Sequence, residues 1–288
     1  MRRLIGICLF WVFLVSCEEI APSAEIPIFV KLEEITLTDL SGQRINNPPG
    51  IRDVWVYDLQ SFQGAYSLSN TFPVLPPENG ILRLEAGIFV DGLSSFRRAY
   101  PFLQPTEVEV SVDPADTLRL RPKFRYFAAS ALEIPFSESF EGGVSKLVTT
   151  ISDPNSTRII VTSEDSFTGS ASGKVTFNSS QNLMFLQSNA FFPLPQGNAE
   201  DVFVEISYRN SVPFTVGLNV VSNSGTQSLT HPVTYSGSDN WNTVFVYLTP
   251  LLDNVPLNSV FQLFISANSG GSSGTIFLDN VRIIHLSP

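Results

Sequence analysis

The 288-residue sequence predicts an all-β protein made of two β-sandwich domains. Short runs rich in Val, Ile, Phe, Tyr and Thr recur along the chain, and 20 prolines and 18 glycines separate them. This pattern is typical of strands joined by turns. No long stretch repeats apolar residues with the 3.6-residue period of a surface helix. Charged residues make up only 15% of the chain, which suits strands whose outer faces carry hydroxyl and amide groups.

The first 17 residues have the features of a secretory signal. Arg2 and Arg3 precede an apolar run over residues 4–15. That run is shorter than the roughly 20 residues that a membrane-spanning helix needs. It ends in the tetrapeptide LVSC at 14–17, which resembles the lipobox of bacterial lipoproteins. The resemblance implies a signal peptide over residues 1–16 and a diacylglycerol group on Cys17. An ordinary signal peptide with an incidental cysteine is the alternative.

A lipid anchor predicts a place in the bacterial cell envelope, as an outer-membrane lipoprotein. Residues 17–25 would then be the lipidated cysteine and its tether. Glu18 and Glu19 resemble the surface-export signal of lipoproteins in the Bacteroidetes group, which implies exposure at the cell surface; a solvated spacer is the alternative. The net charge of −10 argues against nucleic acid as a partner, because that binding depends on Lys and Arg. It also disfavours electrostatic binding to anionic lipid, so the membrane is expected to be reached through the lipid alone.

The first domain is predicted over residues 26–126, with a linker over 127–135. Residues 53–59 (DVWVYDL) read as a strand with apolar side chains on both faces. Trp55 and Tyr57 share one face of this strand, and we expect them in the core; an exposed aromatic platform is the alternative. The order of hairpin, proline-bounded segment and Ala-Gly-Ile strand resembles the Ig-like or prealbumin-like modules of bacterial surface lipoproteins, PEGA-type among them. Such a module implies a spacer or platform.

The second domain is predicted over residues 136–288, and four features occur in it in order. They are an opening Phe-Glu, a Ser-Gly-Lys turn before a strand, a Trp-Asn-Thr lead into a valine-rich strand, and a last strand with Leu-Asp-Asn-Val. Together they resemble the galactose-binding-like jelly rolls that include many carbohydrate-binding modules. The resemblance implies a jelly-roll sandwich. It does not imply one ligand, because this fold hosts many functions.

The same resemblance implies a structural Ca²⁺ between the first and last strands. Glu141 and Asp279 would supply the carboxylates, and backbone oxygens near Ser172 and Gly173 would complete the six to eight oxygen ligands that Ca²⁺ prefers. The alternative is that the two carboxylates cap strand ends or bind backbone N–H groups. No other cofactor is expected.

Sugar binding by such modules uses exposed aromatic rings beside polar side chains. Trp241, Tyr208 and Arg209 are the candidate ligand-binding residues of the second domain. For Trp241 we favour packing at the entrance of a strand over contact with a ligand.

The sequence contains no recognisable catalytic set. His231 and His285 stand apart from any cluster with metal-ligand spacing, and we expect both to be surface or half-buried strand residues. The Gly-x-Ser-x-Gly match at 270–274 lacks the strand, sharp turn and helix of a nucleophile elbow. The sequence therefore predicts a non-enzymatic binding or adhesion protein, with a polysaccharide or a surface protein as partner. The alternatives are a structural subunit of a surface complex and a hydrolase with two converging carboxylates.

Overall fold

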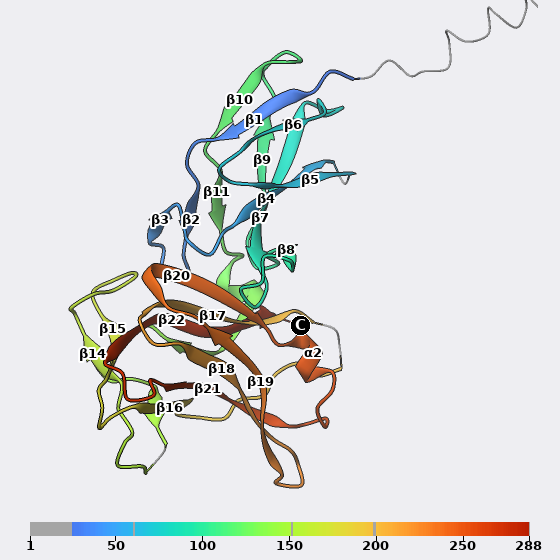
Figure 1. Cartoon of the computed structure of the whole chain (residues 1–288). Helices are drawn as coiled ribbons and strands as arrows, with labels where there is room; N and C mark the ends of the chain where they lie inside the picture. The colour runs from blue at the N-terminus through green and yellow to red at the C-terminus, as the bar shows by residue number, and fades with distance from the viewer. Residues whose placement is uncertain (1–24, 60, 151, 198–199, 288) are drawn as a thin grey trace, which may run out of the picture.

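The computed structural model describes residues 25–59, 61–150, 152–197 and 200–287, so Cys17 and the predicted signal lie outside it. Strands β1–β11 form one body and β12–β22 form a second body stacked against it (Figure 1). The all-β prediction is confirmed. The helices of the described residues are two short segments, η1 (Ala129–Ala131) and α2 (Thr249–Leu252). None in the described part is long and apolar enough to cross a membrane.

The first body contains three small sheets, with strand orders β10-β1-β6, β11-β2-β3 and β5-β4-β7-β8, and β9 adds to β7. Strands β1 and β10 pair in parallel, as do β2 and β11, while the other pairs are antiparallel. The strands are β1 (Ile28–Leu32), β2 (Thr36–Thr38), β3 (Arg44–Asn46), β4 (Asp53–Asp58), β5 (Ser61–Ser67), β6 (Thr71–Val74), β7 (Ile81–Phe89), β8 (Arg97–Ala99), β9 (Thr106–Glu109), β10 (Thr117–Leu120) and β11 (Lys123–Arg125).

Strand β4 shows which of its faces enters the core. Val54 and Val56 are fully buried, whereas Trp55 and Tyr57 are only half-buried on the opposite face. Phe62 of β5, which is 52% exposed, packs against both of these rings. The expectation that Trp55 and Tyr57 lie in the core is therefore wrong. Alternate residues of a strand point to opposite faces, and among the described residues no second sheet packs on the outer face of β4.

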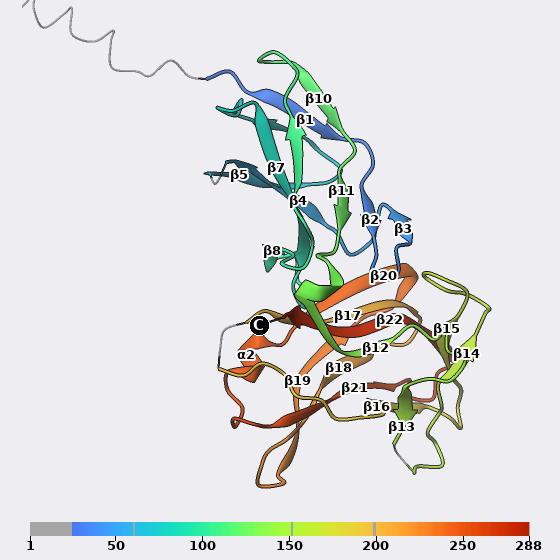
Figure 2. The same cartoon turned by 180° about the vertical axis from the view of Figure 1, so that it is seen from behind.

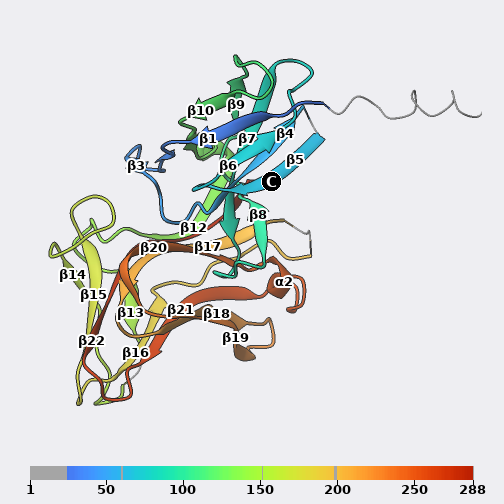
Figure 3. The same cartoon turned by 45° about the horizontal axis from the view of Figure 1, so that its top comes forward.

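The second body is a sandwich of two sheets in which the paired strands are all antiparallel. One sheet has the order β14-β15-β22-β17-β20, with β12 on β22, and the other has the order β13-β16-β21-β18-β19. Figure 3 shows the two layers, with β17 and β20 in the layer next to the first body. The strands are β12 (Leu132–Glu138), β13 (Leu147–Thr149), β14 (Ile160–Thr162), β15 (Ser172–Phe177), β16 (Leu183–Ser188), β17 (Val202–Asn210), β18 (Phe214–Val221), β19 (Gln227–Tyr235), β20 (Ser238–Tyr247), β21 (Val260–Asn268) and β22 (Gly274–Leu286).

Strand β17 is buried on both faces. Val202, Val204 and Ile206 point into the core between the two sheets. Phe203 points the other way and belongs to the core of the first body, as does Phe245 of β20. The apolar cores of the two bodies therefore meet at the outer face of this sheet. Strand β12 begins within the segment expected to be a linker and pairs with β22 (Figure 2).

A tight turn of the first body covers the edge of strand β20. Asp91 and Gly92 both have positive φ angles, 54° and 74°, as in the Asp-Gly turns that favour left-handed conformations. The Asp91 amide donates to the Phe245 carbonyl (2.8 Å), and the Asp91 carboxylate accepts from the Tyr247 amide (2.9 Å). The turn thus supplies the hydrogen bonds that a further strand would make, and it fixes the first body on the second.

Candidate functional site

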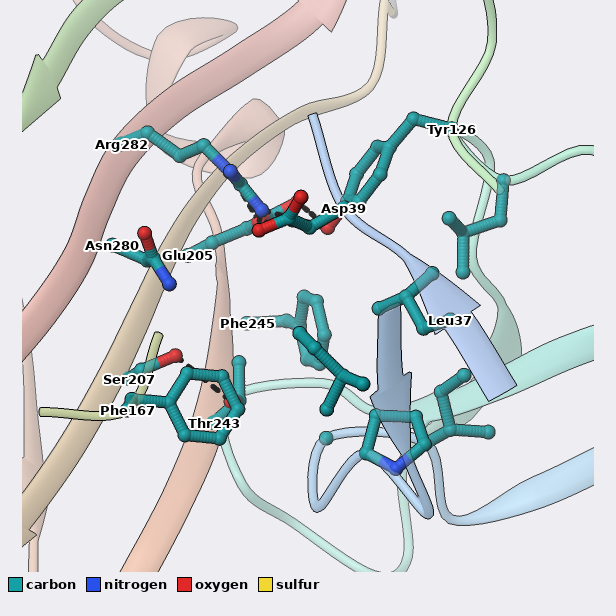
Figure 4. Close-up of a pocket in the computed structure, with 15 residues that line it drawn as sticks. Leu37, Asp39, Tyr126, Phe167, Glu205, Ser207, Thr243, Phe245, Asn280 and Arg282 are labelled. Atoms are coloured by element: carbon teal, nitrogen blue, oxygen red, sulfur yellow. Dashed lines mark hydrogen bonds and ion pairs between the residues drawn. The ribbon is translucent and has the colours of Figure 1, made fainter. Parts of the chain in front are cut away.

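Four polar side chains meet in the interior between the two bodies. The carboxylate of Glu205, on β17, accepts hydrogen bonds from Tyr100 and from Tyr126 of the first body, and from the guanidinium of Arg282 on β22. Arg282 also donates to the Tyr126 hydroxyl (2.9 Å) and lies over that ring at 5.0 Å. Figure 4 shows Arg282 of β22, Glu205 of β17 and Tyr126, which follows β11, converging on one another. We call these four residues the seam cluster.

The seam cluster is almost without solvent. Glu205 is 1% exposed and Tyr100 is 3% exposed. Burial raises the pKa of both tyrosines, and the Glu205 carboxylate raises it further. Burial alone would lower the pKa of Arg282, but the interactions with Glu205, Tyr126 and Tyr100 together outweigh burial and raise the pKa. Arg282 therefore stays charged, and the tyrosines stay hydrogen-bond donors.

A cavity beside the seam cluster is too small for a ligand. It measures about 30 Å³ and is lined mainly by apolar groups, among them Leu37, Phe167 and Phe245 (Figure 4). This volume holds only one or two water molecules. We therefore assign the seam cluster to the joining of the two bodies, not to binding.

A larger pocket, which we call the seam pocket, opens farther along the same junction. It measures about 350 Å³, at the lower end of the 300–1,000 Å³ typical of small-molecule sites. The first body contributes Arg52, Phe89 and the Asp91-Gly92 turn. The second body contributes residues from β17, β19, β20 and the turn that joins the last two: Tyr208, Thr234, Tyr235, Ser236, Gly237, Ser238, Asn242, Thr243 and Val244.

The polar groups of the seam pocket form a chain across the two bodies. Arg52 Nη2 donates to Asn242 Oδ1 (2.6 Å), and Asn242 Nδ2 donates to the Tyr208 hydroxyl (3.1 Å). Tyr235 packs near Tyr208, with 6.0 Å between ring centroids. Its hydroxyl is buried, and no partner among the described residues reaches it. Such an unpaired buried group costs roughly 1–3 kcal/mol.

The structure separates the three predicted ligand-binding residues. Tyr208 is 4% exposed and points into the sandwich core and the seam pocket. Arg209, the next residue on β17, points to the outer face, because neighbouring residues of a strand face opposite sides. There Arg209 pairs with Asp165 (2.8 Å), and the Trp241 indole N–H donates to the same carboxylate (3.0 Å).

Trp241 and Arg209 therefore share a surface on the part of the sheet that the first body leaves open. The Trp241 ring is half-buried and packs against Phe167 and Phe277. The Arg209 guanidinium lies 4.7 Å from the Phe277 ring centroid. Beside them is a wide depression of about 330 Å³, lined by Glu164, Arg209, Asn210, Ser211, Ser238, Asp239, Thr275 and Phe277. We call it the outer depression.

Glu141 and Asp279 hold one loop by its backbone. Asp279 Oδ2 accepts from the amides of Phe167 (3.0 Å) and Thr168 (3.1 Å). Glu141 Oε1 accepts from the amides of Ser170 (2.8 Å) and Ala171 (2.9 Å). This geometry is the alternative that the sequence left open, in which the carboxylates bind backbone N–H groups.

The two carboxyl groups differ in environment. Asp279 is fully buried, and burial raises its pKa to about 6, against the lowering by the Thr168 and Asn280 amides. Hydrogen bonds from Ser170 and Ala171 lower the pKa of the exposed Glu141. The Glu141 charge itself raises the pKa of Asp279, so the two groups lie within electrostatic reach.

Within the described residues, no group of three or more His, Cys, Asp or Glu side chains could hold a metal ion. Glu141 and Asp279 alone offer fewer oxygen ligands than Ca²⁺ requires, and both carboxylates already accept hydrogen bonds from backbone amides. The calcium site stays a prediction.

His285 differs from its expected position. It is 3% exposed, with Nδ1 against the Leu286 carbonyl (2.7 Å) and Nε2 3.5 Å from Glu133 of β12. Strand β12 pairs beside it, and this pairing cannot be read from the sequence pattern around His285. The side chain of His231 lies outside what the structure describes.

No family model and no curated protein matches this chain. Among solved structures, the CBM22-1 xylan-binding domain of Paenibacillus barcinonensis Xyn10C is similar at 16% identity, with a TM-score of 0.40, over 56% of this chain and 99% of that one. The C-terminal family 22 carbohydrate-binding module of Clostridium thermocellum Xyn10B has 14% identity and a TM-score of 0.38, over 54% and 94%. A carbohydrate-binding module of the β-sandwich superfamily has 14% identity and a TM-score of 0.40, over 84% and 88%.

This chain is similar to these carbohydrate-binding modules in fold, and the similarity is distant. It covers about half of the chain in the two family 22 modules. The expected Ig-like or prealbumin-like character of the first domain stays a prediction.

Proposed function

We propose that this chain is a lipid-anchored protein of the bacterial envelope that binds a polysaccharide and catalyses no reaction. The observation that carries the proposal is the outer depression with its neighbours Trp241 and Arg209. It combines half-exposed aromatic surface with a dense set of amide, hydroxyl and charged groups. A sugar presents apolar C–H faces and hydroxyl rims, and a site for it needs both kinds of group.

The openness of the outer depression suits a polymer. A chain of sugars must enter and leave a site at its two ends, so a wide surface serves it better than a closed cavity. Asp165 holds Trp241 and Arg209 in fixed positions through one carboxylate. Such fixed side chains lose little freedom when a ligand binds, which favours affinity.

Affinity electrophoresis of the full chain in detergent, with soluble polysaccharides in the gel, tests this function. We expect at least one polysaccharide to retard the protein, and Trp241→Ala and Arg209→Gln to abolish the retardation. Phe191→Ala is the matched control, because Phe191 is 48% exposed and does not line the outer depression. Equal retardation of all variants, or of none with any polysaccharide, would contradict the proposal.

The anchor has a separate test. Cys17→Ser removes the atom that would carry the lipid, and we expect it to shift the protein from the membrane fraction to the soluble fraction. Protease treatment of intact cells then tests surface exposure. A Cys17→Ser protein that stays in the membrane would contradict the anchor without touching the glycan proposal.

One observation favours the alternative function, a subunit of a surface assembly. The half-buried Trp55 and Tyr57 and the exposed Phe62 form an aromatic cluster on the first body, and Leu59 in the same hairpin is exposed; exposed apolar patches often mark protein contacts. Cross-linking in cells distinguishes the two functions. Loss of a cross-linked partner in Phe62→Ser, with polysaccharide retention absent in the parent chain, would favour assembly.

A further inference from the structure

The seam pocket is a site that only the joined domains create. Arg52, Phe89 and Asp91 come from the first body, while Tyr208, Tyr235 and Asn242 come from the second. Two sets of contacts join the two bodies beside it. Arg98 forms a two-pronged ion pair with Asp201 (2.9 and 2.7 Å), and the seam cluster closes the interior. The pocket is therefore largely preformed, as small-molecule sites usually are.

The charges of the seam pocket select against charged ligands. Its titratable lining consists of one cation, Arg52, one anion, Asp91, and two tyrosines. Burial and the Asp91 charge raise the pKa of Tyr235, and burial raises the pKa of Tyr208. Both tyrosines are thus neutral at physiological pH, and the pocket has no net charge. A ligand with a net charge would be attracted to one of these two side chains and repelled by the other, whereas a neutral ligand leaves their charges balanced.

The hydrogen-bonding groups suit hydroxyl groups that both donate and accept. The guanidinium of Arg52 has five N–H donors, and its bond to Asn242 uses one of them. Arg52 can therefore also donate to a hydroxyl group of a ligand. The Tyr208 hydroxyl accepts from Asn242, so its own proton remains to be donated. The rings of Phe89, Tyr208 and Tyr235 supply apolar surface between these groups.

Tyr235 gives an independent sign of a ligand. Its hydroxyl is buried with no partner among the described residues, although its side chain lines the seam pocket. Gly92 lies against the ring, and a side chain at that position would come within 3.1 Å of it. A buried polar group without a partner is rare in folded proteins and calls for an explanation. A bound molecule that pairs with this hydroxyl would remove the cost.

We infer that the seam pocket binds one neutral sugar residue, or the end of a short oligosaccharide, between the two domains. The choice of a sugar rests on the proposed function, while the neutral, hydroxyl-rich character rests on the pocket itself. The first domain then forms half of a binding site and is more than a spacer. The seam pocket and the outer depression share Ser238, so one glycan could occupy both.

Saturation-transfer NMR and calorimetry with the full chain in detergent test the inference. The probes are the methyl glycosides of glucose, galactose, mannose, xylose, arabinose and N-acetylglucosamine, with glucuronic acid and free amino acids as charged comparisons. We expect a neutral glycoside to bind. Tyr235→Phe and Arg52→Gln should each weaken that binding by about tenfold or more, the loss of one buried hydrogen bond.

Matched controls separate local effects from loss of fold. Tyr66→Phe removes a tyrosine hydroxyl of the first domain that bonds only locally, to the Gln63 carbonyl. Arg119→Gln removes an arginine from an exposed ion pair with Glu33. Both residues lie outside the lining of the seam pocket, and both variants should bind the glycoside as the parent does.

The outcomes distinguish this inference from the proposed function. Binding only of glucuronic acid or amino acids, or glycoside binding that Tyr235→Phe and Arg52→Gln leave unchanged, would overturn the inference. If no glycoside binds while polysaccharide retention still depends on Trp241, the inference fails and the proposed function stands. If a glycoside binds through Tyr235 and Arg52 but no polysaccharide is retained, the inference stands and the proposed function fails.

Discussion

The first body covers one half of the outer face of β17, β20 and β22 and leaves the other half open. Each half contains an arginine, a carboxylate and an aromatic ring. In the covered half, Arg282 pairs with Glu205 and lies 5.0 Å from the Tyr126 ring centroid. In the open half, Arg209 pairs with Asp165 and lies 4.7 Å from the Phe277 ring centroid. The two halves contain nearly the same side-chain groups, and they differ in how far those groups are exposed to solvent.

This difference decides what each group can do. The Arg282 and Glu205 side chains are 12% and 2% exposed, against 37% and 26% for Arg209 and Asp165. A buried ion pair that loses one member leaves an uncompensated charge in a poorly polarisable interior. When an exposed ion pair loses one member, water solvates the charge that remains. The covered half therefore serves stability, and the open half is where we propose that a ligand binds.

The largest predicted effect removes the carboxylate of the covered half. Glu205→Ala leaves Arg282 buried without its counter-ion, so the free energy of unfolding should fall by about 3–5 kcal/mol. Urea denaturation followed by circular dichroism measures it. Asp165→Ala is the matched change in the open half, and an equal loss in both variants would break the comparison.

A pH dependence tests the border between the two halves, where Asp279 holds the loop beneath Phe167. Its pKa is about 6 in the folded protein and 3.8 in the reference state. Between these values the folded protein binds more protons than the unfolded chain, so stability falls as the pH rises from about 4 to 6. The contribution amounts to about 3 kcal/mol.

Chemical denaturation at a series of pH values, compared with Asp279→Asn, isolates this contribution. The parent should lose stability relative to the variant as the pH rises, and a relative gain would contradict the assignment. Repeating the series with EGTA and with Ca²⁺ tests the calcium prediction, because a bound cation would lower the pKa of Asp279 and flatten the curve.

A smaller effect of opposite sign is expected in the seam pocket. Tyr235→Phe removes a buried hydroxyl that has no partner among the described residues. Without ligand, the free energy of unfolding should therefore rise by about 1 kcal/mol. Differential scanning calorimetry measures the shift of the midpoint. A clear loss of stability would mean that the hydroxyl is paired in solution.

The smallest effect concerns the ion pair of the open half. Asp165→Asn should change the free energy of unfolding by less than about 1 kcal/mol, and raising the salt concentration should reduce even that difference. The same variant releases Trp241 and Arg209 from their shared carboxylate, so polysaccharide retention should weaken. Loss of stability without loss of retention would contradict the assignment of this half to binding.

The sequence was a good guide to strands and a poor guide to which of their faces are covered. Glu205 alternates with Val204 and Ile206 along β17, so it lies on the side of the strand that faces away from the core between the two sheets. Glu205 is buried because a separate domain lies on that side, and strand periodicity carries no information about a neighbouring domain. The prediction that Trp55 lies in the core is wrong for the converse reason, because no second sheet of the described residues packs on its face of the strand.

The candidate sites were predictable only in part. Glu141 and Asp279 do lie within electrostatic reach of each other, and Trp241 and Arg209 do share a surface. The seam pocket was not foreseen, because its residues come from segments as distant as Arg52 and Asn242. The Asp91-Gly92 pair is a readable signal for a tight turn. The strand on which that turn docks depends on tertiary packing.

The Asp91-Gly92 turn also bears on how the chain avoids self-association during synthesis. Strand β20 is the last strand on its side of the sheet, and an uncovered edge is a template for pairing with another copy. Domains generally fold from the N-terminus onward as the chain is made, so we expect the Asp91-Gly92 turn to form before β20 is synthesised. A fragment that begins at β12 would lack this protection, and its exposed edge would make it prone to aggregate.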